Sequence, residues 1–362
     1  MLKRILIICF ILGIANANAI EKKDWQILLK QIPEQYILSV DVEQNAIWLL
    51  KSLKSLDKNF TVADDKNKLT LYYKGKVLKS LYKPEDKNDI EKWNSICTEF
   101  TDLIFKNSSI AANHDFEATD LIMQSYIKNL DKDSKYYSSI SDMEETLHRV
   151  NFYSKVEDDI LWIKIRLFNK NTKSDITKAL TENDFAKGVV LDLRGSNGGE
   201  LSTAIAVADI FLEEGIVVSV IGQKQNEIIY YNSKDGDIAE NVPVVILVDG
   251  DTASAAEVLA IALQEQKLAK VIGTQTYGKG TTQKLIRLSN GGILALSNAH
   301  IYTPSGNKMA DEVLIPDVCT SEMPDSKDVV RLLSMGKNEK CHQESRAEAD
   351  LEVKIAKELL KI

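Results

Sequence analysis

The middle of the chain repeats a pattern in which an apolar, β-branched run is followed by a turn of small residues and then by a helical pattern. These β-rich, mainly apolar runs lie at 189–194 and 242–248, and the helical patterns after them lie at 202–212 and 253–264. Continuous apolar runs are typical of strands buried on both faces, so the pattern predicts an α/β core whose sheet is covered by helices. Shorter runs predict further strands at 160–167, 271–272 and 293–296.

The first part of the chain mixes helix and strand signals instead of alternating them. Apolar residues at helical spacing predict helices at 42–56 and 89–105. Between them, β-rich runs at 69–73 and 77–78 flank Gly75 and predict a hairpin. These elements predict a small α+β domain, in which no residue pattern points to chemistry.

Four segments follow from these patterns. We expect a signal peptide at 1–19, an N-terminal α+β domain at 20–112, an α/β core at 113–320 and a C-terminal tail at 321–362. Residues 344–362 of the tail have the pattern of an amphipathic helix. No internal repeat or low-complexity tract marks the boundaries, which rest on the changes of pattern.

The N-terminus has the three parts of a secretory signal peptide. Lys3 and Arg4 precede an apolar run at 5–14, and the small residues 15–19 end in an Ala-x-Ala pattern. The run is short for a membrane span, and an uncleaved anchor is the alternative. A lipoprotein is disfavoured, because Cys9 lies inside the apolar run. The sequence therefore predicts export to the periplasm or cell envelope.

Composition narrows the classes of function. Of the 362 residues, 44% are hydrophobic, which is enough for a packed core, and the net charge of −8 disfavours nucleic-acid binding. The four histidines are not at metal-ligand spacing from one another. We therefore expect no metal, no organic cofactor and no nucleic-acid partner.

Three cysteines remain after the predicted signal peptide: Cys97, Cys319 and Cys341. They are too few for a disulfide scaffold, and none forms a Cys-x-x-Cys pair. Cys319 and Cys341 flank a polar stretch near the C-terminus, so an oxidising compartment would favour a disulfide between them. Two free thiols are the alternative.

Two of the turns that follow apolar runs hold candidate chemistry. The first reads Asp192-Leu-Arg-Gly-Ser-Asn-Gly-Gly and ends in Gly198 and Gly199. Glycines between a strand and a helix expose backbone N–H groups that bind a developing oxyanion, although a plain turn is the alternative. The second reads Thr252-Ala-Ser-Ala-Ala-Glu, where Ser254 opens a helix whose dipole favours negative charge. An ordinary N-cap serine is the alternative there.

A third segment supplies a candidate base. Lys279 lies between two glycines, and Gln283 follows four residues later. A serine hydroxyl becomes a good nucleophile when a base takes its proton, and a desolvated lysine is such a base. The amine must then be neutral, which requires burial to lower its pKa. A solvated loop lysine is the alternative.

Together these segments resemble the carboxy-terminal processing proteases, also called tail-specific proteases, a family of serine peptidases. That family combines an Asp-Leu-Arg turn ending in two glycines, a Ser- and Ala-rich turn ending in Glu, and a Gly-Lys-Gly segment followed by Gln. The matching segments here are 192–199, 252–257 and 273–283, and the likeness covers about residues 115–320. The resemblance implies a crotonase/ClpP-like fold for the α/β peptidase core.

The resemblance also implies a role for each matching residue. Ser254 would be the nucleophile, Lys279 the general base and Gln283 the residue that orients the lysine. The oxyanion hole would consist of the backbone N–H groups of Ala255 and of Gly198 or Gly199.

Two acidic residues near Ser254 in the sequence have different expected roles. Glu265 falls where some members of the family have a functional Asp, and a surface glutamate is the alternative. Glu257, which ends the serine turn, is expected to be structural.

The chain departs from the family's usual pattern in one respect. Most members carry a PDZ module that binds the C-terminus of the substrate. In the family this module stands directly before the strands of the core. Here the interval between Ser138 and the strand predicted from Ile160 is too short for such a module. Recognition of a C-terminal tail is therefore left open.

The sequence thus predicts an exported serine endopeptidase that cleaves peptides or unfolded segments of envelope proteins through an acyl-enzyme. It assigns no adaptor or regulator. One alternative is a periplasmic binding or scaffold protein that keeps the fold without turnover, but the intact Ser/Lys/Gln set argues against it. A crotonase-like enzyme acting on a thioester is another, disfavoured by the signal peptide.

We predict that the mature protein begins at Ile20, because the Ala-x-Ala pattern ends at Ala19. Intact-mass measurement of the exported protein checks this directly. A mass that includes residues 1–19 would contradict it.

Overall fold

The computed structural model describes residues 20–361 except 114–116, 146–150, 224–227, 235–238, 240–241, 312, 322–340 and 344–350. The predicted signal peptide therefore lies outside the described residues. Two compact units are present: one contains the described residues up to Ile140 together with Leu285–Leu296, and the other contains Ser141–Lys284 and the described residues from Ser297 onward. Within the described part of the chain, no helix is long and apolar enough to cross a membrane.

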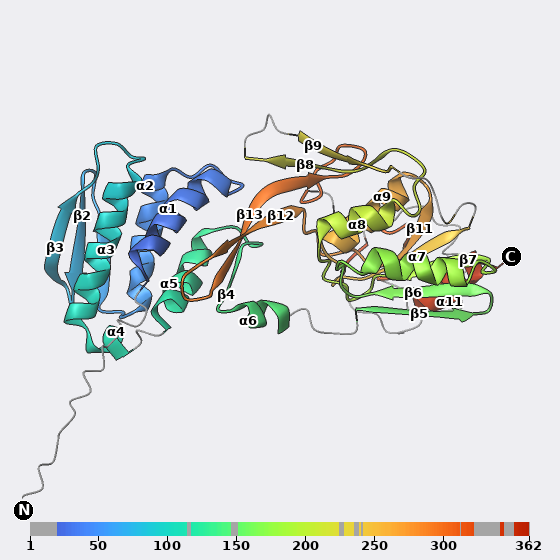
Figure 1. Cartoon of the computed structure of the whole chain (residues 1–362), viewed down its shortest axis with the longest axis horizontal. Helices are drawn as coiled ribbons and strands as arrows, with labels where there is room; N and C mark the ends of the chain where they lie inside the picture. Colours follow the sequence, from blue (N-terminus) through green and yellow to red (C-terminus); the bar gives the residue numbers. More distant parts are fainter. Residues whose placement is uncertain are drawn as a thin grey trace, which may run out of the picture. The chain divides into compact units, whose positions relative to one another are not determined.

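The first unit combines helices with a three-stranded antiparallel sheet of order β1-β2-β3 (Figure 1). The strands are β1 (Phe60–Asp64), β2 (Lys68–Tyr73) and β3 (Lys76–Tyr82). The helices are α1 (Lys22–Gln35), α2 (Val42–Ser52), α3 (Ile90–Asn107), α4 (Ser109–Asn113) and α5 (Ala118–Tyr126), with 3₁₀ turns η1 (Leu53–Ser55) and η3 (Ile127–Asn129). The helices predicted at 42–56 and 89–105 and the hairpin are confirmed, and the unit also contains α1, α4, α5 and β1.

Local interactions fix where these elements begin and turn. The Asp89 carboxylate accepts the backbone N–H of Lys92 at 3.0 Å and so caps α3. Between β2 and β3, Lys74 and Gly75 both have positive φ angles, 49° and 76°. Two consecutive positive φ angles are the geometry of a tight hairpin turn.

One apolar cluster forms the core of the first unit. Trp25 of α1 and Phe100 of α3 are fully buried in it. Helix α5 adds Ile122 to the same cluster, and the segment Leu285–Leu296 adds further apolar side chains. The compact unit therefore extends to Ile140, whereas the sequence predicted a boundary at residue 112.

The second unit is built on a six-stranded sheet of order β14-β11-β10-β7-β6-β5, in which only the β5–β6 pair is antiparallel. Its strands are β5 (Phe152–Glu157), β6 (Ile160–Ile165), β7 (Gly188–Asp192), β10 (Val244–Val248), β11 (Ala269–Gly273) and β14 (Val318–Cys319). The accompanying helices are α6 (Ile140–Glu145), α7 (Thr172–Glu182), α8 (Leu201–Ala208), α9 (Ala255–Glu265) and α11 (Leu351–Leu359).

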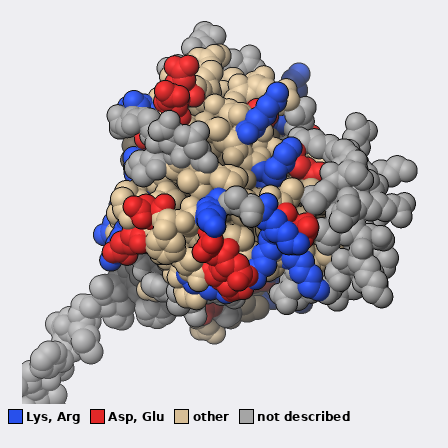
Figure 2. Space-filling view, turned by 90° about the vertical axis from the view of Figure 1, so that its right-hand side faces the viewer, with Lys and Arg blue, Asp and Glu red and all other residues tan. Residues whose placement is uncertain are grey.

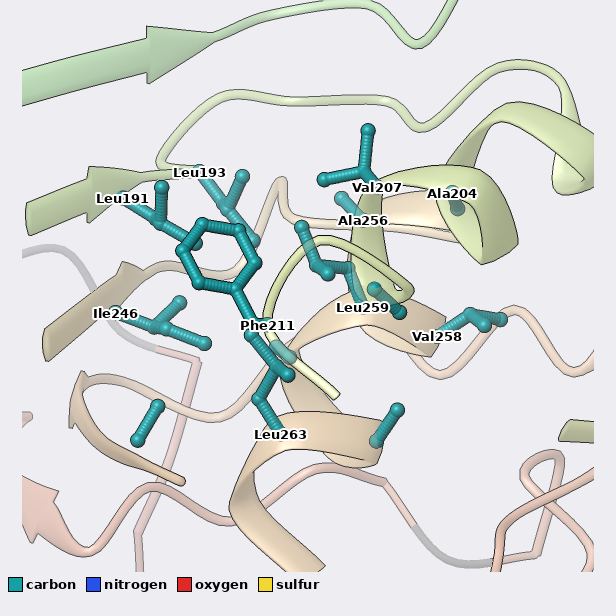
Figure 3. Packing of buried hydrophobic residues seen from close by; sticks show 14 of the residues in the cluster. Leu191, Leu193, Ala204, Val207, Phe211, Ile246, Ala256, Val258, Leu259 and Leu263 are labelled. Atoms are coloured by element: carbon teal, nitrogen blue, oxygen red, sulfur yellow. The ribbon is translucent and has the colours of Figure 1, made fainter. Parts of the chain in front are cut away.

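Helices cover both faces of this sheet. Successive strand residues point to opposite sides, so neighbouring residues of one strand pack in different clusters. Leu161 and Ile246 belong to a buried cluster with side chains of α7, α8 and α9. Ile160 and Trp162 belong to another cluster, with α11. In Figure 3, Phe211 sits among strand residues such as Ile246 and residues of α9. The predicted α/β core with two covered faces is confirmed.

A further sheet has the order β12-β13-β8-β9, and β4 also pairs with β13. Its strands are β4 (Lys135–Tyr137), β8 (Ile216–Gly222), β9 (Ile228–Asn232), β12 (Thr281–Arg287) and β13 (Ile293–Tyr302). β13 pairs with β4 through residues 293–295 and with β8 through residues 299–302. It is therefore longer than the strand predicted at 293–296.

The helix predicted at 202–212 is too long. Helix α8 ends at Ala208, and the Asp209 carboxylate accepts the Ser233 hydroxyl at 2.8 Å and the backbone N–H of Lys234 at 2.7 Å. Phe211 is nevertheless buried in the core, which explains why the apolar pattern continues past the end of the helix.

Of the two alternatives for the C-terminal cysteines, the disulfide is confirmed. Cys319 and Cys341 are bonded, with an S–S distance of 2.06 Å and their Cα atoms 5.8 Å apart. Cys97 is a buried free thiol in the first unit. The predicted C-terminal helix is present as α11, and residues 344–350 of the predicted range lie outside the described residues.

Charges of both signs lie close together at the surface of the second unit. The Lys357 amine pairs with Glu157 at 2.6 Å and with Asp158 at 3.0 Å. On the face shown in Figure 2, basic and acidic side chains lie next to one another in several places. Exposed pairs of this kind contribute little to stability, so the fold depends on its buried clusters.

Candidate active site

Ser254 stands immediately before α9 in a strained backbone conformation. Its φ angle is +56°, in the left-handed region that residues with a Cβ rarely adopt. Such strain persists only where the surrounding structure holds it, and it is concentrated at functional sites. Here the backbone N–H of Ser254 donates to the Glu257 carboxylate at 2.8 Å.

Glu257 connects the serine turn to the loop that carries Lys279. This glutamate is 1% exposed, and its Oε2 atom accepts the backbone N–H groups of both Ser254, at 2.8 Å, and Lys279, at 2.9 Å. Its Oε1 atom accepts the backbone N–H of Gly278 at 2.7 Å and the Thr276 hydroxyl at 2.5 Å. The backbones of Ser254 and Lys279 are therefore held on one oxygen atom.

The electrostatics of Glu257 reflect two opposed effects. Burial raises the pKa of this carboxyl above its ordinary value, although all four donated hydrogen bonds favour the charged form. Replacement by glutamine would put an N–H₂ group, which only donates, opposite groups that also donate. Glu257 is thus structural, as expected, and the spacing Ser-x-x-Glu at a helix start is the sequence signal for it.

The side chains of Lys279 and Gln283 meet as the resemblance implies. The Lys279 amine donates to the Gln283 Oε1 atom at 3.4 Å. Both side chains are half-buried, and Gln283 lies on β12. Because the strand fixes the glutamine backbone, its amide oxygen restricts where the lysine amine can point.

Gly198 packs directly against the serine turn. A Cβ atom at this position would lie 2.6 Å from the Ala253 carbonyl oxygen, 2.8 Å from the Ala255 nitrogen and 2.9 Å from the Ser254 Cβ. Gly198 also has a φ angle of +90°. Only glycine fits this space, so the turn that ends in Gly198 lies beside the backbone N–H of Ala255.

Gly199 is held from the other side by Phe168. The Phe168 N–H donates to the Gly198 carbonyl at 2.8 Å, and the Glu200 N–H donates to the Phe168 carbonyl at 2.9 Å. A Cβ atom at Gly199 would lie 2.2 Å from the Phe168 oxygen. The two predicted oxyanion glycines therefore have different neighbours, and Gly198 is the one against the serine.

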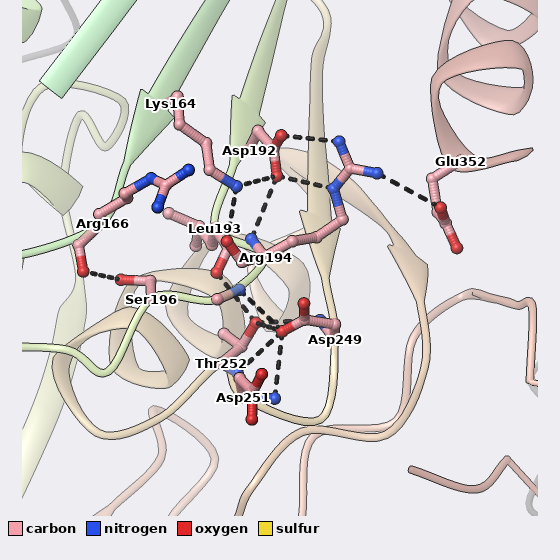
Figure 4. A network of polar contacts seen from close by, with 11 residues as sticks. Lys164, Arg166, Asp192, Leu193, Arg194, Ser196, Asp249, Asp251, Thr252 and Glu352 are labelled. Carbon is pink, nitrogen blue, oxygen red and sulfur yellow. Dashed lines mark hydrogen bonds and ion pairs between the residues drawn. The ribbon is translucent and has the colours of Figure 1, made fainter. Parts of the chain in front are cut away.

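Asp192 and Arg194 fix the start of the glycine turn. In Figure 4, Asp192 lies between Lys164 and Arg194, and Arg194 reaches toward Glu352 of α11. Arg194 donates to Asp192 at 2.8 and 2.7 Å, and the Lys164 amine approaches Asp192 at 3.0 Å. Burial opposes ionisation of Asp192, but the bonds and charges of Arg194 and Lys164 outweigh it and hold the pKa of this carboxyl below its usual value.

Asp249 joins the glycine turn to the serine turn (Figure 4). Its Oδ1 atom accepts the backbone N–H groups of Gly195 at 2.9 Å and Thr252 at 3.0 Å. The Thr252 hydroxyl donates to the Leu193 carbonyl at 3.0 Å. Sequence reasoning did not identify Asp249, whose place at the end of β10 was its only signal.

Glu265 does not face this cluster of turns. Its carboxylate accepts the Ser305 backbone N–H at 2.8 Å and the Ser305 hydroxyl at 2.9 Å. The alternative expected for this residue, a surface glutamate on a helix, agrees with these exposed contacts at the end of α9. Within the described residues, no group of three His, Cys, Asp or Glu side chains is arranged to hold a metal ion.

Comparison with known proteins agrees with this geometry. Residues 159–320 match Peptidase family S41. The chain contains an S41 peptidase domain. This domain includes the glycine turn, the serine turn, Lys279 and Gln283, and the predicted resemblance to carboxy-terminal processing proteases is confirmed.

Two curated relatives show how far the likeness extends. A carboxy-terminal-processing protease of Bartonella bacilliformis is 37% identical over 203 residues, which are 54% of this chain and 47% of the relative. A carboxy-terminal processing protease of Bacillus subtilis is 32% identical over 190 residues, 51% of this chain and 40% of the relative. The chain thus spans less than half the length of these two relatives.

One solved structure resembles most of the fold. A lipoprotein from Streptococcus agalactiae superimposes with a TM-score of 0.54 over 83% of this chain and 91% of its own, at 17% identity. This likeness shows a shared fold for regions beyond the S41 domain. The absence of a PDZ module stays a prediction.

We predict that Gly198→Ala lowers the free energy of unfolding by about 2 kcal/mol or more, since the new methyl group meets backbone atoms and the φ angle is positive. Gly195→Ala is the matched control, because Gly195 also has a positive φ angle but nothing within 4 Å of its Cβ position. Urea unfolding of both variants checks this. Equal destabilisation would mean that the contact with the serine turn is unimportant.

Proposed function

We propose that this chain is an exported serine endopeptidase that hydrolyses peptide bonds through an acyl-enzyme, with Ser254 as nucleophile and Lys279 as general base. The observation that carries the proposal is the shared carboxylate of Glu257, which accepts the backbone N–H groups of both Ser254 and Lys279, while Gly198 packs against Ser254. The S41 domain supports the same chemistry, since the curated relatives that match it are named as proteases.

The first half of the reaction forms the acyl-enzyme. The Ser254 Oγ attacks the peptide carbonyl while the neutral Lys279 amine takes its proton. Negative charge develops on the substrate oxygen, which the N–H groups of Ala255 and of Gly198 or Gly199 stabilise. When the tetrahedral intermediate collapses, the peptide C–N bond breaks and the Lys279 ammonium returns the proton to the leaving amine.

Water completes the reaction. The again neutral Lys279 amine takes a proton from a water molecule, whose oxygen attacks the ester, and Ser254 recovers its proton as the acid product leaves. Gln283 keeps the amine in place by accepting its hydrogen bond. The positive end of the α9 dipole lies at Ser254 and favours the negative charge of the intermediate.

The proposed substrates are peptides or unfolded protein segments in the periplasm or cell envelope. A polypeptide substrate follows from the protease relatives, and export follows from the predicted signal peptide. The relatives' names suggest cleavage near a carboxyl terminus. No adaptor, regulator or cofactor is part of the proposal.

We predict that Ser254→Ala abolishes hydrolysis of casein and leaves the fold intact, because a capping serine contributes only about 1 kcal/mol. Casein digestion and thermal unfolding of both proteins provide the measurement. The same comparison separates a peptidase from a scaffold protein that shares the fold. A wild-type protein that binds casein without cleaving it would replace our proposal with that alternative.

We predict that Lys279→Arg is as inactive as Lys279→Ala. A guanidinium keeps the positive charge but does not give up its proton in proteins, so it cannot act as a base. The measurement is kcat/KM for both variants on one peptide substrate. Activity of the arginine variant within about tenfold of wild type, a barrier change of about 1.4 kcal/mol, would show that the lysine is an electrostatic anchor instead.

A further inference from the structure

A short segment beyond the S41 domain lies against the loop that carries Lys279. This segment is Cys341–Gln343, and the disulfide to Cys319 ties it to the last strand of the six-stranded sheet. Cys341 is 3% exposed. The backbone N–H of His342 also donates to the Ser321 hydroxyl at 3.1 Å, so the segment is held at two points.

Two hydrogen bonds join the segment to the lysine loop. The backbone N–H of Gln275 donates to the His342 carbonyl at 3.3 Å. The Gln343 side-chain amide donates to the Thr276 carbonyl at 2.5 Å. On its other side, Gln343 lies against Gly250, two residues before the serine turn, where an added Cβ atom would lie 3.1 Å from the backbone carbonyl oxygen of Gln343.

Thr276 is the residue through which this contact reaches the site. Its carbonyl accepts from Gln343, while its hydroxyl donates to the Glu257 carboxylate that also holds Gly278 and Lys279. Residues 275–280 have no helical or strand structure. The position of this loop therefore depends on individual contacts, and Gln343 supplies one of them.

We propose that Gln343, held in place by the Cys319–Cys341 disulfide, is a positioning residue for the loop that carries Lys279. The inference rests on the proposed function, since it assigns Gln343 a role in the reaction of that site. The amide of Gln343 does not touch the substrate. It acts through Thr276, which shares the Glu257 carboxylate with the backbone of Lys279, and so holds the loop from which the lysine amine extends.

The disulfide makes this arrangement sensitive to reductants. A dithiol such as dithiothreitol breaks the Sγ–Sγ bond by exchange, leaves two cysteine thiols and is itself oxidised to a cyclic disulfide. Cys341 then loses its covalent link to Cys319, and the Gln343 amide is held on the Thr276 carbonyl only by the remaining hydrogen bonds of the segment, so we expect this contact to weaken. Oxidation state and Gln343 should therefore affect catalysis through the same contact.

The kinetic test compares wild type with Gln343→Ala. We expect kcat to fall by about tenfold with KM within about twofold, because misplacement of a reacting group affects the chemical step. Gln266→Ala is the matched control: the Gln266 amide also donates to a distant backbone carbonyl, that of Ile216 at 3.0 Å, but at the far end of α9. This control should keep its kcat.

A double-mutant cycle tests the link to the disulfide. Cys319→Ala with Cys341→Ala should lower kcat to the same degree, and adding Gln343→Ala should lower it little further, because both changes remove one contact. Wild-type protein treated with dithiothreitol gives the same comparison if the cysteine variant does not fold. Additive effects, or a Gln343→Ala enzyme with wild-type kcat, would overturn the proposal.

Hydrogen exchange separates this inference from the proposed function. The backbone N–H groups of Gly278 and Lys279 donate to Glu257, and their exchange should quicken in Gln343→Ala but not in Gln266→Ala. If the wild type hydrolyses no peptide but exchange quickens in Gln343→Ala, the proposed peptidase function is wrong and the contact of Gln343 with the lysine loop is supported. Unchanged exchange in Gln343→Ala would overturn the contact itself.

Discussion

The arrangement of the site depends on one buried carboxylate, that of Glu257. An ionised side chain without water is unfavourable unless nearby groups donate hydrogen bonds to it. Glu257 obtains four, from the serine turn and from the loop before β12. The serine turn and the lysine loop cannot move apart without leaving this buried charge short of hydrogen-bond donors, so the cost of an unsatisfied buried charge holds their relative position.

The same device recurs along one edge of the six-stranded sheet. Asp192 ends β7 and accepts from Arg194 of the turn that follows it. Asp249 follows β10 and accepts from Gly195 and Thr252 of two turns. In parallel sheets the carboxyl ends of strands meet at one edge, where ligands of α/β proteins bind. The carboxylates of Asp192, Asp249 and Glu257 thus hold loops that have no regular secondary structure of their own.

The sequence predicts this fold and the position of several residues of the candidate site for a physical reason. Buried strands such as β7 and β10 are continuous apolar runs, and Ser254 and Lys279 stand in local motifs, so short windows contain the information. The contact of Gln343 with Thr276 joins residues 67 positions apart, and no short window predicts it. The predicted end of α8 is wrong for a related reason. Phe211 lies in a turn after the helix but is buried by tertiary packing, so the apolar pattern continues beyond the helix.

The C-terminal helix shows that the S41 domain is not sufficient for its own core. Glu352 of α11 is fully buried, accepts the Thr320 hydroxyl at 2.6 Å and lies 3.5 Å from the Arg194 guanidinium. Leu351 and Ile355 cover the sheet face that Ile160 and Trp162 form. A chain ending at residue 320 would expose that face and leave Arg194 with one carboxylate fewer. The residues beyond the family match therefore belong to the folded unit that positions the glycine turn.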